Sequence, residues 1–192
     1  ERMIEHHFHV EMEHGHGDVL TEISSKARQR PGTVVLEDIT GQTLKHRMVL
    51  VGAEVLGGRF RRLLDGSQER VGVLLPNVNT TAVSLLGLWR IGKIPAVLNY
   101  STGVPMMLTC AELAGVRQDI TSRVFLVKAS LDVTPMEAAG IEFIYLEDIR
   151  KNISGLTKLG VLLKHRLALG QARFNIPTDR TAVILFTSGS EG

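Results

Sequence analysis

Short runs of apolar residues, separated by stretches with a helical pattern, organise the chain from residue 33 onward. Residues 71–75 and 94–98 are the clearest runs, and the amphipathic stretch between them closes at Gly92. Continuous apolar runs of this length are typical of strands buried on both faces of a parallel sheet. A strand, a helix and a strand within about 30 residues predict a βαβ unit with a right-handed crossover.

The same alternation continues along the rest of the chain. Residues 116–120 belong to it, although Gln118 and Asp119 make this segment polar for a buried strand. Alternating strands and helices predict an α/β fold with a mostly parallel sheet and flanking helices. The further elements predicted are a helix at 19–30, strands at 33–38, 116–120, 141–146 and 181–186, and helices at 46–64, 105–114 and around 124–127.

The helix predicted at 46–64 contains three glycines, Gly52, Gly57 and Gly58. Each glycine costs about 1 kcal/mol relative to alanine inside a helix. We therefore expect these glycines to face a tightly packed neighbour.

Residues 148–174 are predicted to be helical and basic, with leucines opposite the charges. A helix of this kind could lie on an anionic membrane surface. Basic outer faces are common on soluble proteins, however, so the pattern favours a solvated outer helix. No run of about 20 apolar residues occurs in the sequence, so no transmembrane segment is predicted. The leucines are Leu156, Leu159, Leu162, Leu163 and Leu167.

Residues 1–30 differ in composition from the rest of the chain. Five of the seven histidines lie between positions 6 and 16, and their spacing matches no zinc pattern, so no metal site is predicted. We interpret 1–30 as a linker, the tail of a preceding domain or a remnant of cloning, and 31–192 as the amino-terminal portion of the main domain.

Composition narrows the class of protein further. Hydrophobic residues make up 44% of the chain and charged residues 22%, as in ordinary globular proteins. The formal net charge of +2 argues against a nucleic-acid-binding protein, which usually carries a concentrated basic face. Cys110 is the only cysteine, so no internal disulfide can form; a reducing compartment and a core role for Cys110 are expected.

The strand predicted at 181–186 leads directly into a loop of small and hydroxyl residues. Such a loop lets backbone N–H groups approach phosphate oxygens while hydroxyls donate further hydrogen bonds. A flexible turn explains the six residues equally well. The spacing matches neither a Walker loop, nor a dinucleotide fingerprint, nor a nucleophile elbow. The loop residues are Thr187, Ser188, Gly189, Ser190, Glu191 and Gly192.

Residues 186–192 resemble the opening of the signature loop of adenylate-forming enzymes, which usually continues with Pro-Lys-Gly. Residues 71–77 and 89–100 resemble the early strand and the following helix–strand segment of that superfamily. Within it, 98–103, 120–123 and the Ser190–Glu191 pair are similar to the acyl-acyl-carrier-protein synthetase half of bifunctional 2-acylglycerophosphoethanolamine acyltransferases.

The resemblance implies an enzyme that uses ATP and Mg²⁺ to convert a fatty acid to acyl-AMP and then transfers the acyl group to the thiol of acyl carrier protein. It implies phosphate contacts for the six loop residues, with Glu191 turned away from phosphate or toward the metal. The lysine and metal motifs would follow Gly192, so no catalytic residue is expected within 1–192, and the fragment alone is expected to be inactive.

The resemblance also implies a lysophospholipid-acyltransferase domain upstream and a location on the cytoplasmic side of the inner membrane, peripheral to it or tethered there. Two alternatives stay open: a long-chain acyl-CoA synthetase that uses coenzyme A as acceptor, and a non-catalytic binding or docking module that keeps the fold. The residues after Gly192 would separate the second alternative from an enzyme.

Overall fold

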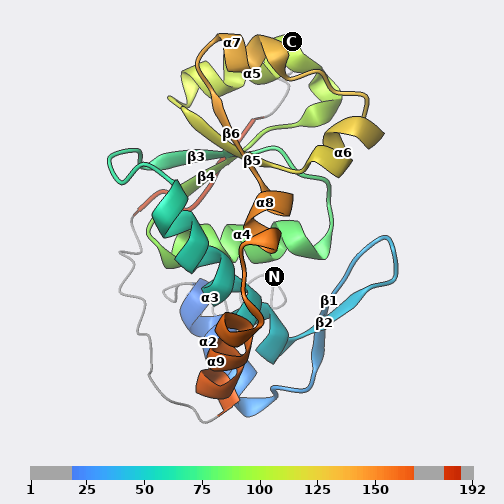
Figure 1. Cartoon of the computed structure of the whole chain (residues 1–192), viewed down its shortest axis with the longest axis vertical. Coiled ribbons are helices and arrows are strands. Elements are labelled where there is room, and N and C mark those ends of the chain that lie inside the picture. Colours follow the sequence, from blue (N-terminus) through green and yellow to red (C-terminus); the bar gives the residue numbers. More distant parts are fainter. Residues whose placement is uncertain (1–18, 167–179, 187–192) are drawn as a thin grey trace, which may run out of the picture.

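Five parallel strands form the centre of the molecule in the computed structural model, which describes residues 19–166 and 180–186 (Figure 1). The strand order is β6-β5-β3-β4-β7 and every neighbouring pair is parallel. The predicted α/β class with a mostly parallel sheet is therefore confirmed. The strands are β3 (Arg70–Val73), β4 (Ile94–Val97), β5 (Gln118–Thr121), β6 (Glu142–Tyr145) and β7 (Ile184–Leu185).

Helices cover both faces of this sheet, giving three layers (Figure 1). On one face, side chains of the sheet such as Leu74 and Leu98 pack against Met107 and Met136. On the other face, Val71 and Val73 pack with other apolar side chains of a second core. The first layer holds α5 (Val104–Leu113), α6 (Arg123–Lys128) and α7 (Thr134–Ala138), and the second α3 (His46–Leu63), α4 (Asn79–Arg90) and α8 (Leu146–Lys151).

The predicted βαβ unit is present as β3, α4 and β4, with β3 and β4 in parallel register from Arg70 opposite Ile94 to Val73 opposite Val97. Gly92 ends the crossover with a φ of 75°, a left-handed conformation that glycine adopts without strain. Cys110, on α5, is half-buried against the first core, in keeping with the expected packing role.

A third apolar cluster lies on the outer side of α3 and α4. The helix α2 (Val19–Gln29) contributes Leu20, which packs with Val49 and Leu86. The antiparallel hairpin of β1 (Val34–Glu37) and β2 (Thr43–Lys45) adds Leu36 and Leu44 to this cluster. The helix predicted at 19–30 and the strand predicted at 33–38 are thus confirmed.

Two of the three glycines in α3 mark its close approach to α4. A Cβ at Gly57 would lie 2.9 Å from the carbonyl oxygen of Gly87, and one at Gly52 would lie 2.7 Å from Cγ1 of Val83. Gly58 has no atom within 4 Å of that position, so the prediction was wrong for this residue.

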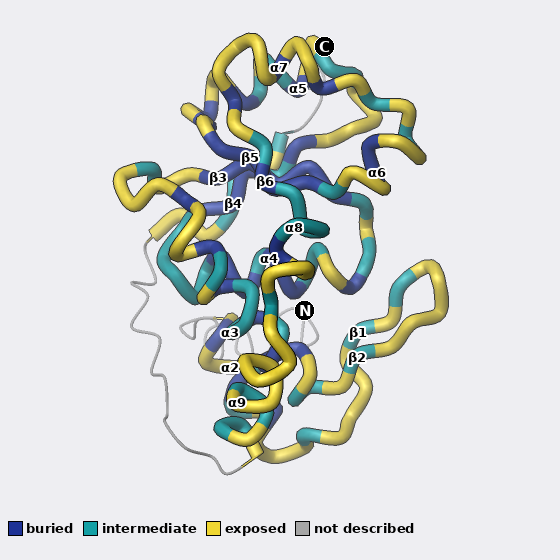
Figure 2. Tube along the Cα trace, viewed as in Figure 1, coloured by how far each residue is buried: buried dark blue, intermediate teal, exposed yellow. Residues whose placement is uncertain are grey.

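The polar strand predicted at 116–120 occupies an interior place in the sheet. It forms β5, between β3 and β6, and all four of its residues are buried (Figure 2). Gln118 meets its hydrogen-bonding needs by accepting from the backbone N–H of Asp65 at 2.7 Å and donating toward Glu142 at 2.6 Å. The side chain of Asp119 is fully buried as well.

Two predicted elements differ from the structure. The helix expected at 148–174 is divided into α8 and α9 (Gly155–Arg166), with a break at 152–154, and residues 167–174 lie outside the described ranges. The segment 181–186 was predicted as a buried strand, but β7 has two residues and Leu185 is 66% exposed. In the described part of the chain β7 has one neighbour, β4, which leaves its other edge uncovered. None of the helices in the described ranges is both long and apolar enough to cross a bilayer.

Glu54 joins three helices through ion pairs. Its carboxylate, on α3, accepts from the guanidinium of Arg90 on α4 at 2.9 Å, and from Lys164 at 2.7 Å and His165 at 3.0 Å on α9. The hydrogen bond from His165, together with the cations Lys164 and Arg90 and against the effect of burial, lowers the pKa of Glu54 to about 2.

Replacing Glu54 by Gln is expected to destabilise the chain by about 2 kcal/mol at neutral pH, less than the roughly 3–5 kcal/mol for a fully buried pair because solvent reaches this site. A depressed pKa gives stability above the unfolded value of 4.5 that is lost as pH falls through about 2. Urea unfolding should therefore show that the difference in stability between wild type and Glu54→Gln becomes smaller in acid. Glu69→Gln, which breaks the more exposed pair with Arg180, is the control and should change stability by less than about 1 kcal/mol.

Candidate functional site

The carboxyl ends of parallel strands lie at one edge of a sheet, where ligands of open α/β folds bind. In register, Ala96 pairs with Ile184 and Val97 with Leu185, so the chain leaves β7 next to the end of β4. Phe186 packs on the core beneath this edge. The loop 187–192 therefore starts at the carboxyl edge, although the six predicted phosphate-binding residues themselves lie outside the described ranges.

The approach to that loop is fixed by contacts with the βαβ unit. The indole Nε1 of Trp89 donates to the carbonyl oxygen of Ala182 at 2.6 Å. The guanidinium of Arg180 donates to Gly92 O at 2.9 Å and pairs with Glu69. Sequence pattern does not reveal these positioning roles, because the partners lie 88 to 111 residues apart in the chain and the β4–β7 pairing brings them together.

Next to the start of the loop, the chain leaving β4 forms a hydroxyl-rich turn, η1 (Tyr100–Thr102). The side chain of Asn99 accepts from the backbone N–H of Ser101 at 3.0 Å and from its hydroxyl at 2.8 Å. The hydroxyl of Thr102 donates to the backbone oxygen of Asn99 at 2.8 Å. The turn is thus held by local hydrogen bonds, as expected for an Asn-x-Ser sequence after a strand.

A cavity of about 470 Å³ lies at the carboxyl ends of β3 and β5. From β3 the chain runs to β4 on one side and later returns to β5 on the other, which makes the carboxyl ends of β3 and β5 a topological switch point. The floor of the cavity is apolar, and Arg150 and Lys158 lie at its exposed border. Its apolar lining includes Leu56, Leu75, Val78, Leu146 and Ile153.

The carboxylate of Glu147 joins α8 to the start of α6 beside this cavity. It accepts from the hydroxyl of Ser122 at 2.7 Å and from the backbone N–H groups of Arg123 and Val124, each at 3.2 Å. Burial raises the pKa of Glu147, but these hydrogen bonds outweigh it and the pKa lies below the usual value. Glu147 is therefore ionised at neutral pH, with its charge compensated by α6.

Arg123 extends the same network outward. Its guanidinium pairs with Asp148 at 2.7 Å and lies 3.8 Å from the ring centre of Tyr145. The hydrogen bond from Arg123 lowers the pKa of Asp148. These contacts hold the ends of β5 and β6 together, which is a positioning role.

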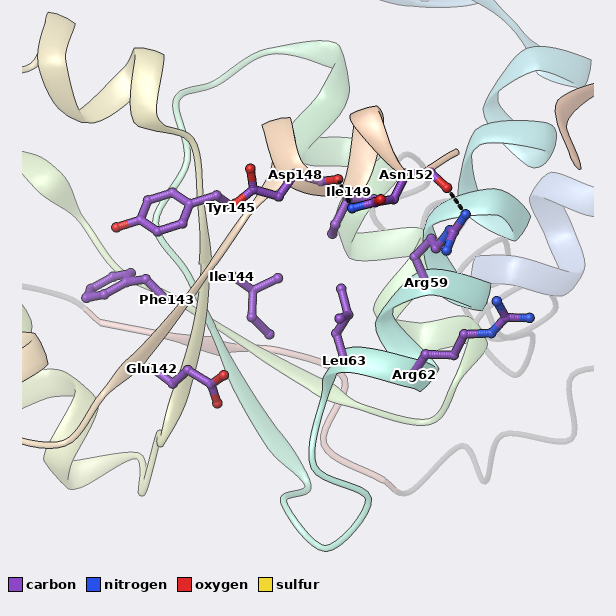
Figure 3. Close-up of a pocket in the computed structure, with 10 residues that line it drawn as sticks. All are labelled: Arg59, Arg62, Leu63, Glu142, Phe143, Ile144, Tyr145, Asp148, Ile149 and Asn152. Carbon is purple, nitrogen blue, oxygen red and sulfur yellow. Dashed lines mark hydrogen bonds between the residues drawn. The ribbon is translucent and has the colours of Figure 1, made fainter. Parts of the chain in front are cut away.

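A second cavity, of about 350 Å³, follows the outer edge strand β6 and is lined by residues of α3 and α8 (Figure 3). Leu63 and Ile144 approach each other across its centre, and Arg59 donates to the backbone oxygen of Asn152 (Figure 3). Because β6 and β7 are at opposite edges of the sheet, this cavity is remote from the start of the loop.

Metal-binding geometry does not appear at either cavity. Within 19–166 and 180–186, no group of three or more His, Cys, Asp or Glu side chains is placed to hold a metal ion. The histidines at positions 6–16 and the acid Glu191 are outside those ranges.

Known proteins resemble this chain in sequence pattern and in fold. Residues 23–192 match the sequence model of a family described as AMP-binding enzyme. Among solved structures, O-succinylbenzoate coenzyme A synthetase (MenE) from Bacillus subtilis, in complex with AMP, is 15% identical with a TM-score of 0.68, covering 88% of this chain and 39% of that one. VinN is 18% identical with a TM-score of 0.64, covering 92% of this chain and 41% of that one.

The N-terminal domain of FACL13 from Mycobacterium tuberculosis is also similar, at 15% identity and a TM-score of 0.60, with 72% of this chain and 37% of that one covered. The chain thus spans well under half the length of these structures. At such low identity the likeness concerns the arrangement of strands and helices, which is that of the amino-terminal domain of adenylate-forming enzymes.

Proposed function

This chain belongs to the AMP-binding enzyme family, and on that premise we propose that it is the front part of an ATP-dependent fatty acid:acyl-carrier-protein ligase. The observation that supports this most is the pairing of β7 with β4, which places the residue before the hydroxyl- and glycine-rich loop at the carboxyl edge of the sheet. The exit from β7 is also anchored by Trp89 and Arg180, so the loop has a fixed starting point.

The proposed chemistry has two steps. A carboxylate oxygen of the fatty acid attacks the α-phosphorus of ATP, the bond to pyrophosphate breaks, and acyl-AMP forms. A thiol then attacks the acyl carbon, and AMP leaves with the electrons of the broken carbon–oxygen bond. In the first step, backbone N–H groups and hydroxyls stabilise the charge that develops on the β- and γ-phosphates. We assign this role to Thr187, Ser188, Gly189, Ser190 and Gly192.

Glu191 has a different proposed role in the same loop. A carboxylate facing phosphate would repel it, so Glu191 would turn away from the phosphates or toward Mg²⁺, which prefers oxygen ligands. The catalytic groups of the parent enzyme would be supplied from outside residues 1–192.

We propose acyl carrier protein as the acceptor because 98–103, 120–123 and Ser190–Glu191 are similar to the acyl-acyl-carrier-protein synthetase branch. Coenzyme A is the alternative, and the name of one similar structure, O-succinylbenzoate coenzyme A synthetase, gives that acceptor for that protein. The branch also supports a lysophospholipid-acyltransferase domain in the parent and a place at the cytoplasmic side of the inner membrane.

The acceptor can be tested on the full-length parent protein with labelled fatty acid, ATP and Mg²⁺. We expect labelled thioester on holo-acyl carrier protein and little on coenzyme A. Apo-acyl carrier protein, which lacks the phosphopantetheine thiol, is the matched control and should stay unlabelled. Preferential labelling of coenzyme A would show that coenzyme A is the acceptor in place of acyl carrier protein, and the proposed adenylation step would still stand.

A further inference from the structure

The helix α9 directs polar side chains toward the rest of the molecule and exposes its leucines. Its polar residues Lys164 and His165 point inward and contact the carboxylate of Glu54 on α3 at 2.7 and 3.0 Å. Its leucines point outward instead: Leu156 is 81% exposed, Leu159 50% and Leu163 46%. No residue of α9 is buried (Figure 2).

The three leucines form one continuous stripe. At 100° per residue, Leu156, Leu159 and Leu163 fall within about 60° of one another around the helix axis. Lys164 and His165 lie on the side toward α3, where they contact Glu54. By helix geometry Lys158 also lies away from the stripe, and it lines the 470 Å³ cavity. A solvated outer helix would place its leucines inward, whereas three of the leucines of α9 are exposed.

The charge around this stripe is of one sign. Residues 150–166 contain five lysines and arginines and no aspartate or glutamate. Of these, Lys151 and Arg166 are exposed, and Arg166 lies beside the stripe on the helix. Leucines exposed on a helix with a basic surround fit the boundary between headgroups and acyl chains of an anionic membrane, where apolar burial and attraction to lipid charge add together.

We propose that α9 binds an anionic lipid surface, inserting Leu156, Leu159 and Leu163 while the basic side chains around them contact lipid phosphates. The ion pairs with Glu54 hold α9 on α3 and orient the stripe outward. This proposal rests on α9 alone and does not depend on the thiol acceptor or on adenylation. A second copy of the chain or another part of the parent could also cover leucines, but neither would require a segment without acidic residues.

The test is co-sedimentation of the 192-residue chain with vesicles. We expect binding to phosphatidylcholine vesicles that contain about a third phosphatidylglycerol, and little binding to pure phosphatidylcholine. Leu156→Gln combined with Leu159→Gln and Leu163→Gln should weaken binding at least about tenfold. Arg166→Glu should weaken it by about fivefold or more and reduce its salt dependence.

The matched control is Leu113→Gln with Val127→Gln, which replaces two side chains that are 78% and 80% exposed on the layer covering the other face of the sheet. This control should bind vesicles like the parent chain. Circular dichroism melting checks folding of every variant, and the single change Leu156→Gln serves if the triple variant melts early. The proposal would be overturned by equal binding to both vesicle types or by undiminished binding of the leucine variants. It would also be overturned if the leucine variants lost self-association and kept vesicle binding.

Discussion

Replacing Asp119 by Asn is expected to make the chain more stable at neutral pH and to flatten its pH dependence. Asp119 lies in β5, completely buried, and burial raises the pKa of its carboxyl well above 3.8. Its Oδ1 accepts from the backbone N–H of Leu74 at 3.1 Å, whereas within the described residues its Oδ2 has no hydrogen-bond partner. The folded chain therefore holds a proton there that the unfolded chain releases.

The sign of the effect follows from proton binding. A raised folded pKa gives stability that is complete below the unfolded pKa and is lost as pH rises toward the folded pKa. Across that window, wild-type stability should fall relative to Asp119→Asn by up to about 1.4 kcal/mol per pH unit. Urea unfolding from about pH 4 upward measures the difference. Asp132→Asn is the control, because hydrogen bonds from Thr134 lower the pKa of that exposed residue. The stability of Asp132→Asn relative to wild type should therefore not increase with rising pH. Parallel pH profiles for wild type and Asp119→Asn would contradict this account.

The second large effect is expected at Gly72, which pairs with Asp119 in the sheet. A Cβ at position 72 would lie 2.0 Å from Oδ2 of Asp119, 2.7 Å from its Cγ and 3.0 Å from Cγ1 of Val116. Asp119 is short and fully enclosed, so it has little room to move. Gly72→Ala should therefore cost about 3 kcal/mol, at the upper end of the range for overpacked cores.

A double-mutant cycle attributes that cost to the contact. Asp119→Ala removes the clashing atoms, and Leu74 N–H keeps its hydrogen bond to Ile120 O at 3.0 Å. Gly72→Ala combined with Asp119→Ala should recover about 1–2 kcal/mol relative to additivity. Gly32→Ala is the control, since no atom lies within 4 Å of a Cβ there. Additive losses at positions 72 and 119 would show that the clash is not the cause.

Much of the fold could be predicted from hydrophobic pattern, and the exceptions have physical reasons. The apolar runs at 71–75 and 94–98 correspond to β3 and β4, because strands covered on both faces need apolar residues throughout. The place of Asp119 inside β5 could not be read from periodicity, because it depends on the glycine opposite. The direction of the leucines on α9 depends on Glu54, about 100 residues earlier in the chain.

The candidate site, too, could be predicted from the sequence only in part. The small and hydroxyl residues of the loop 187–192 are enough by themselves to suggest phosphate contact. The position of the chain where it enters this loop depends on the pairing of β7 with β4, two strands far apart in the sequence. Hydrophobic pattern does not specify which strands become neighbours, so the anchoring contacts of Trp89 and Arg180 became visible only in three dimensions.

The most direct test of adenylation is fatty-acid-dependent exchange of labelled pyrophosphate into ATP by the full-length parent, which requires the first half-reaction and no acceptor thiol. We predict exchange that depends on fatty acid and Mg²⁺ and falls by about 100-fold or more when Ser188 and Ser190 are both replaced by Ala. Absence of exchange with every acyl chain length tried, in a parent shown to be folded, would contradict the assignment as an adenylating enzyme.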